Sequence, residues 1–474
     1  MEQQAWTQEL DVRRPARWLQ GPRDIARFLL DPVAELIQRA HQRDASGVSL
    51  ISRSARGDWV CALGPANNRE VLTRPAVFSM TPNPYPFEIR PGSALQRLNQ
   101  AVVYVDGEAH KRQRACIAPA MHPTFLSDQM ALVADEIVAL SETWRPGSVV
   151  DLSCAMRGLS LRISQRSLFG RPKETGEGAL CELLEAYVQS LSSPGVFSLP
   201  FDLPLSPVRT LYQRAERVER TVRALLAERR MSAPGSDLMS VLLHAGSSPS
   251  GPVASDEDVV GNLVVLFLAS HETVCQALIW GAFLLAQHPH ITADLRDELD
   301  AALGPRPPTH ADLPKLPLLE RVAKEVLRIC SPIVYMMRVA RQGAELSGRA
   351  LRPGTRVVWS PFMTQRLPEL YSHPNRFDPS RWERVTPVPY AYLPFGAGPH
   401  ACIGGAFATG ELMIVLAVLV QRLGLEAIEG AEIDRKVHLT LSTRRPIQLR
   451  IKHRADRQRA ASVRGNVREI IDLP

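Results

Sequence analysis

The sequence is poor in cysteine, and its cysteines form no pattern. Seven occur in 474 residues, and no two are spaced as C-x-x-C. A disulfide framework or a zinc finger needs paired or clustered cysteines, so the scatter argues against both and favours a reducing compartment. The count still allows one cysteine with a special role. The seven are Cys61, Cys116, Cys154, Cys181, Cys275, Cys330 and Cys402.

The sequence pattern also lacks a signal peptide and a membrane anchor. The first 30 residues contain no apolar stretch suited to either. Only the run from Val259 to Gln287 is long enough to span a membrane. It carries Glu272 near its centre, three acids precede it, and no Lys or Arg flanks it. We therefore expect a cytoplasmic protein in which this run is a helix buried inside a large soluble domain.

The net positive charge of the sequence is concentrated in one segment. The net charge is +7, and residues 444–468 hold nine Lys or Arg and one acid, or +8, which leaves 7 − 8 = −1 for the rest. This charge predicts a solvated basic tail over 454–474, with an interaction arm as the alternative. No nucleic-acid motif accompanies it, so we expect no nucleic-acid partner. Only six of the 56 basic residues are lysines, which suggests a GC-rich bacterial source.

Internal repeats and low-complexity segments are absent, and amphipathic helical patterns dominate. Strand-like pieces are short and cluster near the two ends of the chain, so one small sheet built from both ends is predicted. The fold class is therefore mainly α with a minor β-sheet, in a single domain over 31–453 preceded by an extension over 1–30. Helices are expected over 31–43, 126–144, 211–230, 259–287, 292–303, 318–330 and 405–423, and strands over 47–53, 58–64, 355–361 and 445–451.

The stretch "FGAGPHACIGG", residues 395–405, is a glycine-rich loop around Cys402. Gly396, Gly398 and Gly404 permit positive φ and a close approach of the backbone to a flat partner. Backbone N–H groups at the start of the following helix stabilise a thiolate. Such a cysteine is a metal ligand or a nucleophile, and zinc would need more Cys or His than the nearby His400. The loop alone leaves a merely structural turn about equally favoured.

This loop resembles the haem-binding signature of the cytochrome P-450 superfamily, F-x-x-G-x-H/R-x-C-x-G. Phe395, Gly398, His400, Cys402 and Gly404 match it. The resemblance spans about 31–450 and is of the soluble bacterial type. It implies a haem-thiolate protein with Cys402 as the axial metal ligand of haem b, because a thiolate pushes electron density onto iron and favours O–O cleavage.

The segment "DGEAHKRQR" places His110 and Arg114 on one helical face. A solvated basic face is the plain interpretation, and aligned positive groups also suit carboxylates. The resemblance implies that His110 and Arg114, together with Arg338 in "VYMMRVA" and His400, bind the two haem propionates.

The motif "KEVLR" places Glu325 and Arg328 on one side of a helix. Alone, this spacing predicts an exposed ion pair worth less than about 1 kcal/mol. The resemblance implies a structural triad completed by Arg376 of "PNRF". That triad would clamp the proline-rich segment 361–399, which leads to Cys402.

The polar residues inside the apolar run, "ASHETV", resemble the family's oxygen-activating motif, A/G-G-x-D/E-T-T/S. Thr273 is expected to bond a carbonyl one turn back, near Ala269, and to leave a groove for dioxygen and water. Glu272 is expected to handle protons, so Glu272 and Thr273 are the predicted catalytic residues. His271 is predicted to be a packed or rim histidine. Ser270 and Val274 depart from the motif, with an open effect on oxygen activation.

The resemblance implies a monooxygenase that inserts one oxygen atom of O2 into a hydrophobic small molecule by hydroxylation or epoxidation. The segments 78–105, 187–207, 265–270, 332–337 and 438–443 are predicted to line its pocket. Their apolar character suggests a terpenoid, polyketide or fatty-acyl substrate in specialised metabolism.

No redox domain is fused to the chain, so we expect electrons from NAD(P)H through a separate ferredoxin and ferredoxin reductase, or flavodoxin. Lys111 and Arg112 are candidates for steering an acidic ferredoxin. We also expect a monomer. The alternatives are a peroxide-driven or non-oxygenating haem-thiolate enzyme, disfavoured by Glu272 and Thr273, and a non-catalytic module that binds a carrier protein, disfavoured by Cys402.

Overall fold

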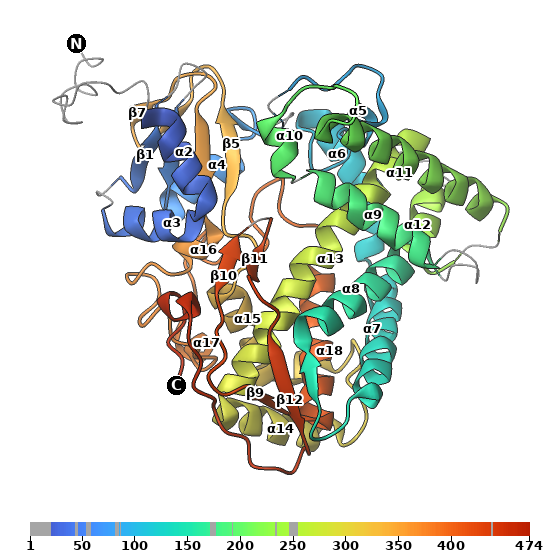
Figure 1. Cartoon of the computed structure of the whole chain (residues 1–474), viewed down its shortest axis with the longest axis vertical. Coiled ribbons are helices and arrows are strands. Elements are labelled where there is room, and N and C mark those ends of the chain that lie inside the picture. The colour runs from blue at the N-terminus through green and yellow to red at the C-terminus, as the bar shows by residue number, and fades with distance from the viewer. Residues whose placement is uncertain are drawn as a thin grey trace.

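The computed structural model describes residues 20–42, 46–53, 58–80, 85, 87–170, 177–191, 193–232, 235–245, 255–437 and 439–474. In Figure 1 the strands β1, β5 and β7 lie beside α2 to α4 on one side of the molecule, and α7 to α9, α11 and α12 lie on the other. The long helix α13 runs between these two parts. The predicted class, mainly helical with a minor sheet, is confirmed.

The helices include every one expected from the sequence. Their bounds are α2 Gln20–Leu30, α3 Pro32–His41, α4 Pro65–Thr73, α5 Ala94–Leu98, α6 Gly107–Ile117, α7 Pro123–Thr143, α8 Leu152–Phe169, α9 Glu177–Leu191, α10 Pro194–Ser198, α11 Pro207–Arg230, α12 Leu238–Ala245, α13 Asp256–Gln287, α14 Pro289–Leu303, α15 Pro317–Ile329, α16 Pro361–Thr364, α17 Arg381–Arg384 and α18 Gly405–Arg422. Short 3₁₀ turns cover Ala118–Met121, Leu313–Lys315 and Asn466–Glu469.

The strands form several small sheets. Their bounds are β1 Val48–Ser52, β2 Trp59–Ala62, β3 Phe78–Ser79, β4 Val149–Asp151, β5 Met336–Ala340, β6 Glu345–Leu346, β7 Arg349–Ala350, β8 Arg356–Trp359, β9 Gly424–Ala427, β10 Arg435–Val437, β11 Leu441–Thr443 and β12 Gln448–Lys452. The largest sheet has the order β1-β2-β8-β5-β3. It joins early and late strands, as expected, through the parallel pair β2 and β8. The prediction that 445–451 joins it is wrong, because β12 pairs with β4 and β9 in a sheet of its own.

Helix α13 forms the centre of the core. Ser255 caps it in a reciprocal pair with Asp258, acids fill its first turn, and it ends at His288, just before Pro289. Most of its side chains are buried, including Phe267, Trp280 and Phe283. Helices α13 and α18 are long and apolar enough to span a membrane, but 67% of the apolar window of each is buried inside the protein. Both are core helices of this fold.

The two expected extensions belong to the domain wherever they are described. Helix α2 buries Phe28, whose ring lies 4.9 Å from that of Tyr335 between centroids. At the other end Val463, Val467 and Ile470 are buried in the main core, and the backbone N–H of Asp472 donates to the carbonyl of Asn375. The solvated tail predicted over 454–474 is therefore wrong, because apolar residues between the arginines dock on the core. Residues 1–19 lie outside the described part.

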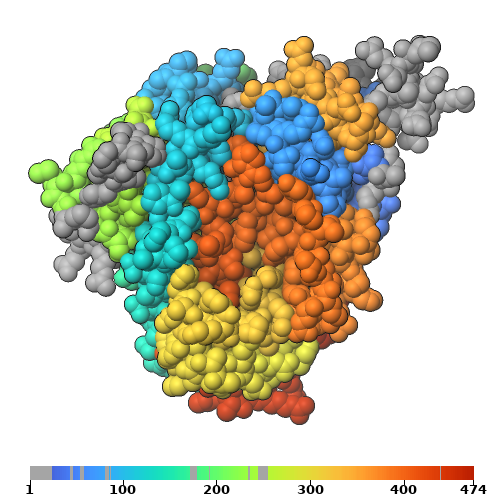
Figure 2. Space-filling view, turned by 180° about the vertical axis from the view of Figure 1, so that it is seen from behind, coloured from blue at the N-terminus to red at the C-terminus, as the bar shows by residue number. Residues whose placement is uncertain are grey.

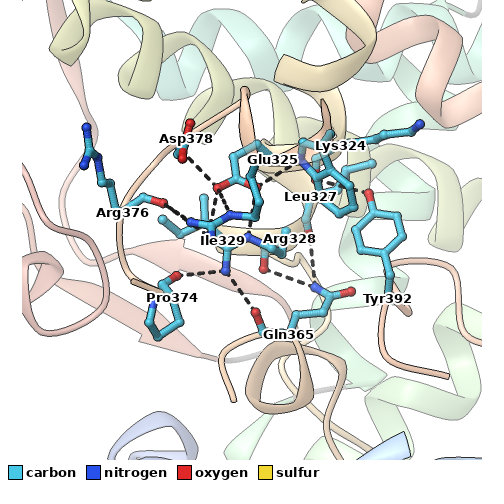
Figure 3. Close-up of polar contacts among 12 residues, drawn as sticks. Lys324, Glu325, Leu327, Arg328, Ile329, Gln365, Pro374, Arg376, Asp378 and Tyr392 are labelled. Atoms are coloured by element: carbon cyan, nitrogen blue, oxygen red, sulfur yellow. Dashed lines mark hydrogen bonds and ion pairs between the residues drawn. The ribbon is translucent and has the colours of Figure 1, made fainter. Parts of the chain in front are cut away.

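A buried ion cluster ties α15 to the segment 361–399, which we call the meander (Figure 3). Glu325 and Arg328 are both fully buried. They form a two-pronged ion pair with N–O distances of 2.9 Å. Arg328 also donates to the carbonyl oxygens of Gln365 at 2.9 Å and Pro374 at 2.8 Å. The pair is therefore a clamp on the meander and not the exposed pair that its spacing alone predicts.

The third member of the cluster is Arg381, and the prediction of Arg376 is wrong. Arg381 Nε lies 3.3 Å from Glu325 Oε1. The Arg376 side chain is exposed and points away from Glu325 in Figure 3, and only its carbonyl oxygen joins the cluster, 3.3 Å from Arg328 Nη2. The second Pro-x-Arg-aromatic stretch, "PSRW", therefore supplies the arginine, because α17 turns its side chain inward.

The two arginines give a matched test. Arg381→Ala removes a partner from a fully buried carboxylate, and breaking a buried pair typically costs about 3–5 kcal/mol. Arg376→Ala keeps the carbonyl that the cluster uses, so its effect should stay within about 0.5 kcal/mol. Urea unfolding followed by circular dichroism measures both. A larger loss from Arg376→Ala than from Arg381→Ala would contradict this assignment.

Candidate functional site

The loop 395–405 lies between the meander and the start of α18. Gly396 and Gly398 have φ values of 65° and 73°. A Cβ atom at Gly398 would lie 2.2 Å from the carbonyl oxygen of Leu72, so only glycine fits there. The N–H of Cys402 donates to the carbonyl of Phe395 at 2.8 Å and closes the loop. Gly404, expected to use a positive φ, has a φ of −86° and precedes α18 as its N-cap.

The Cys402 thiol is exposed to the space in front of the loop. Protein atoms still surround it, and this desolvation raises the pKa of the thiol, whereas the N–H of Gly404 and the charge of Arg114 oppose the rise. Those two groups do not outweigh the burial. A bound metal ion supplies the additional positive charge that makes a cysteine a thiolate.

Several basic side chains gather beside the loop. The rings of His110 (α6) and His400 lie 4.0 Å apart between centroids, and Arg114 donates to the carbonyl of Ala401 at 2.7 Å. His400 Nε2 lies 2.9 Å from Asp106 Oδ1. The structure thus brings His110, Arg114 and His400 together. Asp106, which precedes α6, was not among the predicted site residues; its one sequence signal is its place as an acid four residues before His110.

Arg338 on β5 is buried, and its described side-chain hydrogen bond goes to the carbonyl of Met337 at 3.0 Å. No carboxylate of the described residues lies within ion-pair distance of it. Burial lowers its pKa to about 10, and the charge of Asp106 opposes this shift. Burial, with contributions from His400 and Arg114, lowers the pKa of His110 to about 4. The site therefore offers the buried cation Arg338, which has no carboxylate partner among the described residues, and a neutral His110 beside His400, whose Nε2 contacts Asp106.

The middle of α13 shows the hydrogen bond expected for Thr273. Its hydroxyl donates to the carbonyl of Ala269 at 2.7 Å. Ala269 is exposed, whereas Phe267 and His271, two residues before and after it, are buried, so this side of α13 faces open space. Such a hydroxyl bond to the preceding turn widens the helical ladder locally.

Glu272 is held by two donors that reach the same oxygen. The Thr440 hydroxyl lies 3.1 Å from Glu272 Oε1, and the Gln276 amide lies 3.2 Å from it. Neither Thr440 nor Gln276 was expected from the sequence. Gln276 could have been found, since a residue four positions on lies on the same helical face; Thr440 comes from a distant hairpin and carries no local signal.

Ser270 and Val274, the two residues that depart from the family motif, point away from the open face of α13 beside Ala269. Ser270 Oγ lies 3.0 Å from Ser164 Oγ of α8 and 3.3 Å from the carbonyl of Phe267. Val274 is buried in the main core. The Ser270 hydroxyl is therefore engaged with α8.

His271 is packed, as predicted. It is 2% exposed, its ring stacks on Phe267, and neither ring nitrogen has a hydrogen-bond partner among the described residues. Its Nε2 lies 3.7 Å from Glu185 Oε1 of α9. Burial lowers its pKa to about 4, with the charge of Glu272 opposing the shift.

This histidine gives the fold a pH dependence. An unfolded histidine has a pKa of about 6.5. Between that value and the folded pKa of about 4 the unfolded chain binds a proton that the folded chain excludes, so stability is lost as pH falls through this window and is retained above it. At about 1.4 kcal/mol per pKa unit, His271→Gln should reduce the loss between pH 7 and 4.5 by about 2–3 kcal/mol.

Urea unfolding at the two pH values measures the loss. His290→Gln is the control, because the His290 side chain is exposed. If His271→Gln lost as much unfolding free energy between pH 7 and 4.5 as the unmodified protein, the imidazole of His271 could not be neutral and buried.

Comparisons with known proteins agree with this site. A family model described as Cytochrome P-450 matches residues 60–452. The cyclooctat-9-en-7-ol 5-monooxygenase of Streptomyces melanosporofaciens is 33% identical over 80% of this chain and 85% of its own length. The cyclooctatin synthase of the same organism is 32% identical over 73% and 77%. The pentalenene oxygenase of Streptomyces avermitilis is 30% identical over 86% and 93%.

Solved structures share the fold. A retinoic-acid-bound cyanobacterial CYP120A1 superposes with a TM-score of 0.76 at 23% identity and covers 90% of this chain and 95% of its own. A cytochrome P-450DA haem domain gives the same TM-score at 24% identity, covering 90% and 94%.

The chain belongs to the cytochrome P-450 family and is a haem-dependent monooxygenase that uses O2 on a hydrophobic substrate. Its residues fit the family's cofactor. Haem carries two carboxylates. The buried guanidinium of Arg338 has no carboxylate partner among the described residues and, after burial, is the next largest cause that lowers the pKa of His400, which gathers with His110 and Arg114. The glycine-built loop presents the exposed Cys402 thiol, which is the type of ligand that a haem-thiolate centre uses.

Proposed function

We propose that Cys402 ligates the haem iron and that His110, Arg114, Arg338 and His400 bind the haem propionates. The proposal is supported by the loop geometry around Cys402 and by the gathering of basic side chains next to it. When bound, haem supplies the activation of O2 for oxygen insertion. The chain's own residues orient the cofactor, keep Cys402 in place and handle protons at Glu272 and Thr273.

The ligand assignment has a direct spectroscopic test. Cys402→Ser should still bind haem through the propionate partners but should lose the red-shifted Soret band of the reduced carbon monoxide complex, because that band needs a thiolate ligand. Cys154→Ser, at an exposed cysteine on α8, is the matched control and should keep the band. Survival of the band in Cys402→Ser would refute the assignment.

We propose that the substrate is a cyclic terpenoid and that the product is its hydroxylated or epoxidised form, in bacterial specialised metabolism. The observation that carries this is the set of relatives named for cyclooctatin and pentalenene chemistry, each at least 30% identical over most of this chain. A polyketide or fatty-acyl substrate is the second candidate, because the apolar lining alone does not distinguish them.

The described parts of the predicted pocket segments agree with an apolar substrate. Tyr85 and Phe87 stack at 5.2 Å, and Tyr85 lies 6.5 Å from Phe197 between ring centroids. Tyr187, Val196, Val265 and Phe267 share one buried apolar cluster with Tyr85, and Phe87 packs against it. Residues 81–84, 86, 192 and 438, which the sequence also assigned to the pocket, lie outside the described residues. Rigid aromatic walls favour a compact ring system over a flexible chain.

The substrate class is tested by titrating the haem-loaded protein with pentalenene, cyclooctat-9-en-7-ol, dodecanoic acid and a macrolide aglycone. We expect a low-spin to high-spin shift with the terpenoids, and a product one oxygen atom heavier with ferredoxin, reductase and NAD(P)H. A shift with the fatty acid or the macrolide alone would overturn the terpenoid proposal. Faster turnover with hydrogen peroxide than with the redox partners would favour the peroxide-driven alternative.

We further propose that the protein is a cytoplasmic monomer that receives electrons from a separate ferredoxin or flavodoxin. An open pocket of about 380 Å³ borders the cysteine loop, lined by His110, Lys111, Arg114, Ala115, Ala118, Gly398 and Pro399. Figure 2 shows this face, with the orange late segments between the cyan α6–α7 region and the blue early helices. Lys111 and Arg112 are exposed there, which suits an acidic partner, although Glu108 and Asp258 lie near them.

A further inference from the structure

The hairpin β10–β11 is attached to α13 at two points. The Thr440 hydroxyl donates to Glu272 Oε1 at 3.1 Å, and Trp280 Nε1 donates to the carbonyl of Leu441 at 2.9 Å. Val437 and Leu441 form the last pair of the hairpin, so Thr440 lies in its turn. Thr440 is 1% exposed and Leu441 is fully buried. Thr440 and Leu441 are thus packed directly on the helix that carries the acid.

The attachment leaves one oxygen of the acid available. Both donors, Thr440 and Gln276, reach Oε1, and Oε2 accepts no hydrogen bond from any residue in the described part of the chain. Gln276 belongs to α13 and moves with Glu272. Thr440 belongs to another element, so within the described part of the chain its hydrogen bond is the one that connects the carboxylate to a structure outside its own helix.

We propose that Thr440 is a positioning residue that fixes Glu272 through Oε1, so that contact of the substrate with the β10–β11 turn sets the orientation of the acid that handles protons. The inference rests on the proposed role of Glu272 and on the predicted place of 438–443 in the substrate pocket. With Oε1 held, Oε2 accepts a proton from water and returns it to water in the groove beside Thr273. The Thr440 hydroxyl keeps its own proton throughout.

Positioning of Glu272 by Thr440 depends on the hydroxyl of Thr440 and not merely on the volume of its side chain. Valine has nearly the shape of threonine but donates no hydrogen bond, so in Thr440→Val the Oε1 atom of Glu272 keeps only the Gln276 donor of its own helix. Serine keeps the donor and loses a methyl group. Thr440→Val and Thr440→Ser therefore separate positioning from packing. Thr292→Val is the matched control, because Thr292 is also buried and its hydroxyl donates to the carbonyl of Leu285, away from the hairpin.

The first measurement needs no substrate. Infrared difference spectra of the haem-loaded protein identify the carboxylate stretch of Glu272 as the band lost in Glu272→Gln. Thr440→Val should shift this band, whereas Thr440→Ser and Thr292→Val should leave it in place. An unshifted band in Thr440→Val, or an equal shift in Thr292→Val, would overturn the inference.

The second measurement is the hydrogen peroxide released per NAD(P)H consumed with ferredoxin, reductase and pentalenene. Thr440→Val should raise this ratio several-fold and Thr440→Ser should restore it. If Glu272→Gln itself leaves the ratio unchanged, the proposed role of Glu272 fails, and this inference fails with it. If Glu272→Gln raises the ratio and Thr440→Val does not, the inference alone fails.

Discussion

A carboxylate with no access to water is the constraint on which the site depends. Glu325 is fully buried, and a buried charge is tolerated only when hydrogen bonds replace the water it has lost. Five hydrogen bonds do so, from Arg328 (two), Arg381, Trp382 and the N–H of Asp378. Most of these donors lie on the meander. Satisfying Glu325 therefore fixes the course of the chain that leads to the cysteine loop.

The polar residues at the middle of helix α13 also depend on hydrogen bonds that replace water, although they are less deeply buried than Glu325. This largely apolar helix crosses the core, and most of the polar side chains at its middle have a hydrogen-bond partner. Thr273 donates to its own helix, Ser270 turns to α8, and Glu272 takes donors from Gln276 and Thr440. His271 is the exception, held by burial without a hydrogen bond. The polar residues at the middle of α13 thus form hydrogen bonds with different neighbours on different faces of the helix.

The features predicted correctly are those that local spacing determines. Gly396 and Gly398 were recognisable as positions of positive φ, and the bond from Thr273 to Ala269 follows from helical geometry. The errors concern contacts between distant segments. Arg376 and Arg381 both sit in a Pro-x-Arg-aromatic stretch, and only the path of the meander decides between them. Thr440 and Asp106 matter because they contact Glu272 and His400, and the distance along the sequence between these partners gives no sign of either contact.

Residues 470–472 give the meander a second support. Asp472 forms a backbone β-bridge with Arg376, its N–H donates to the carbonyl of Asn375, and the carbonyl of Ile470 accepts from Arg366. The meander that positions the cysteine loop is therefore held both by Glu325 and by a segment that contributes no side chain to the haem site. A substitution in 470–472 can in this way loosen the cysteine loop without changing any residue that binds the cofactor.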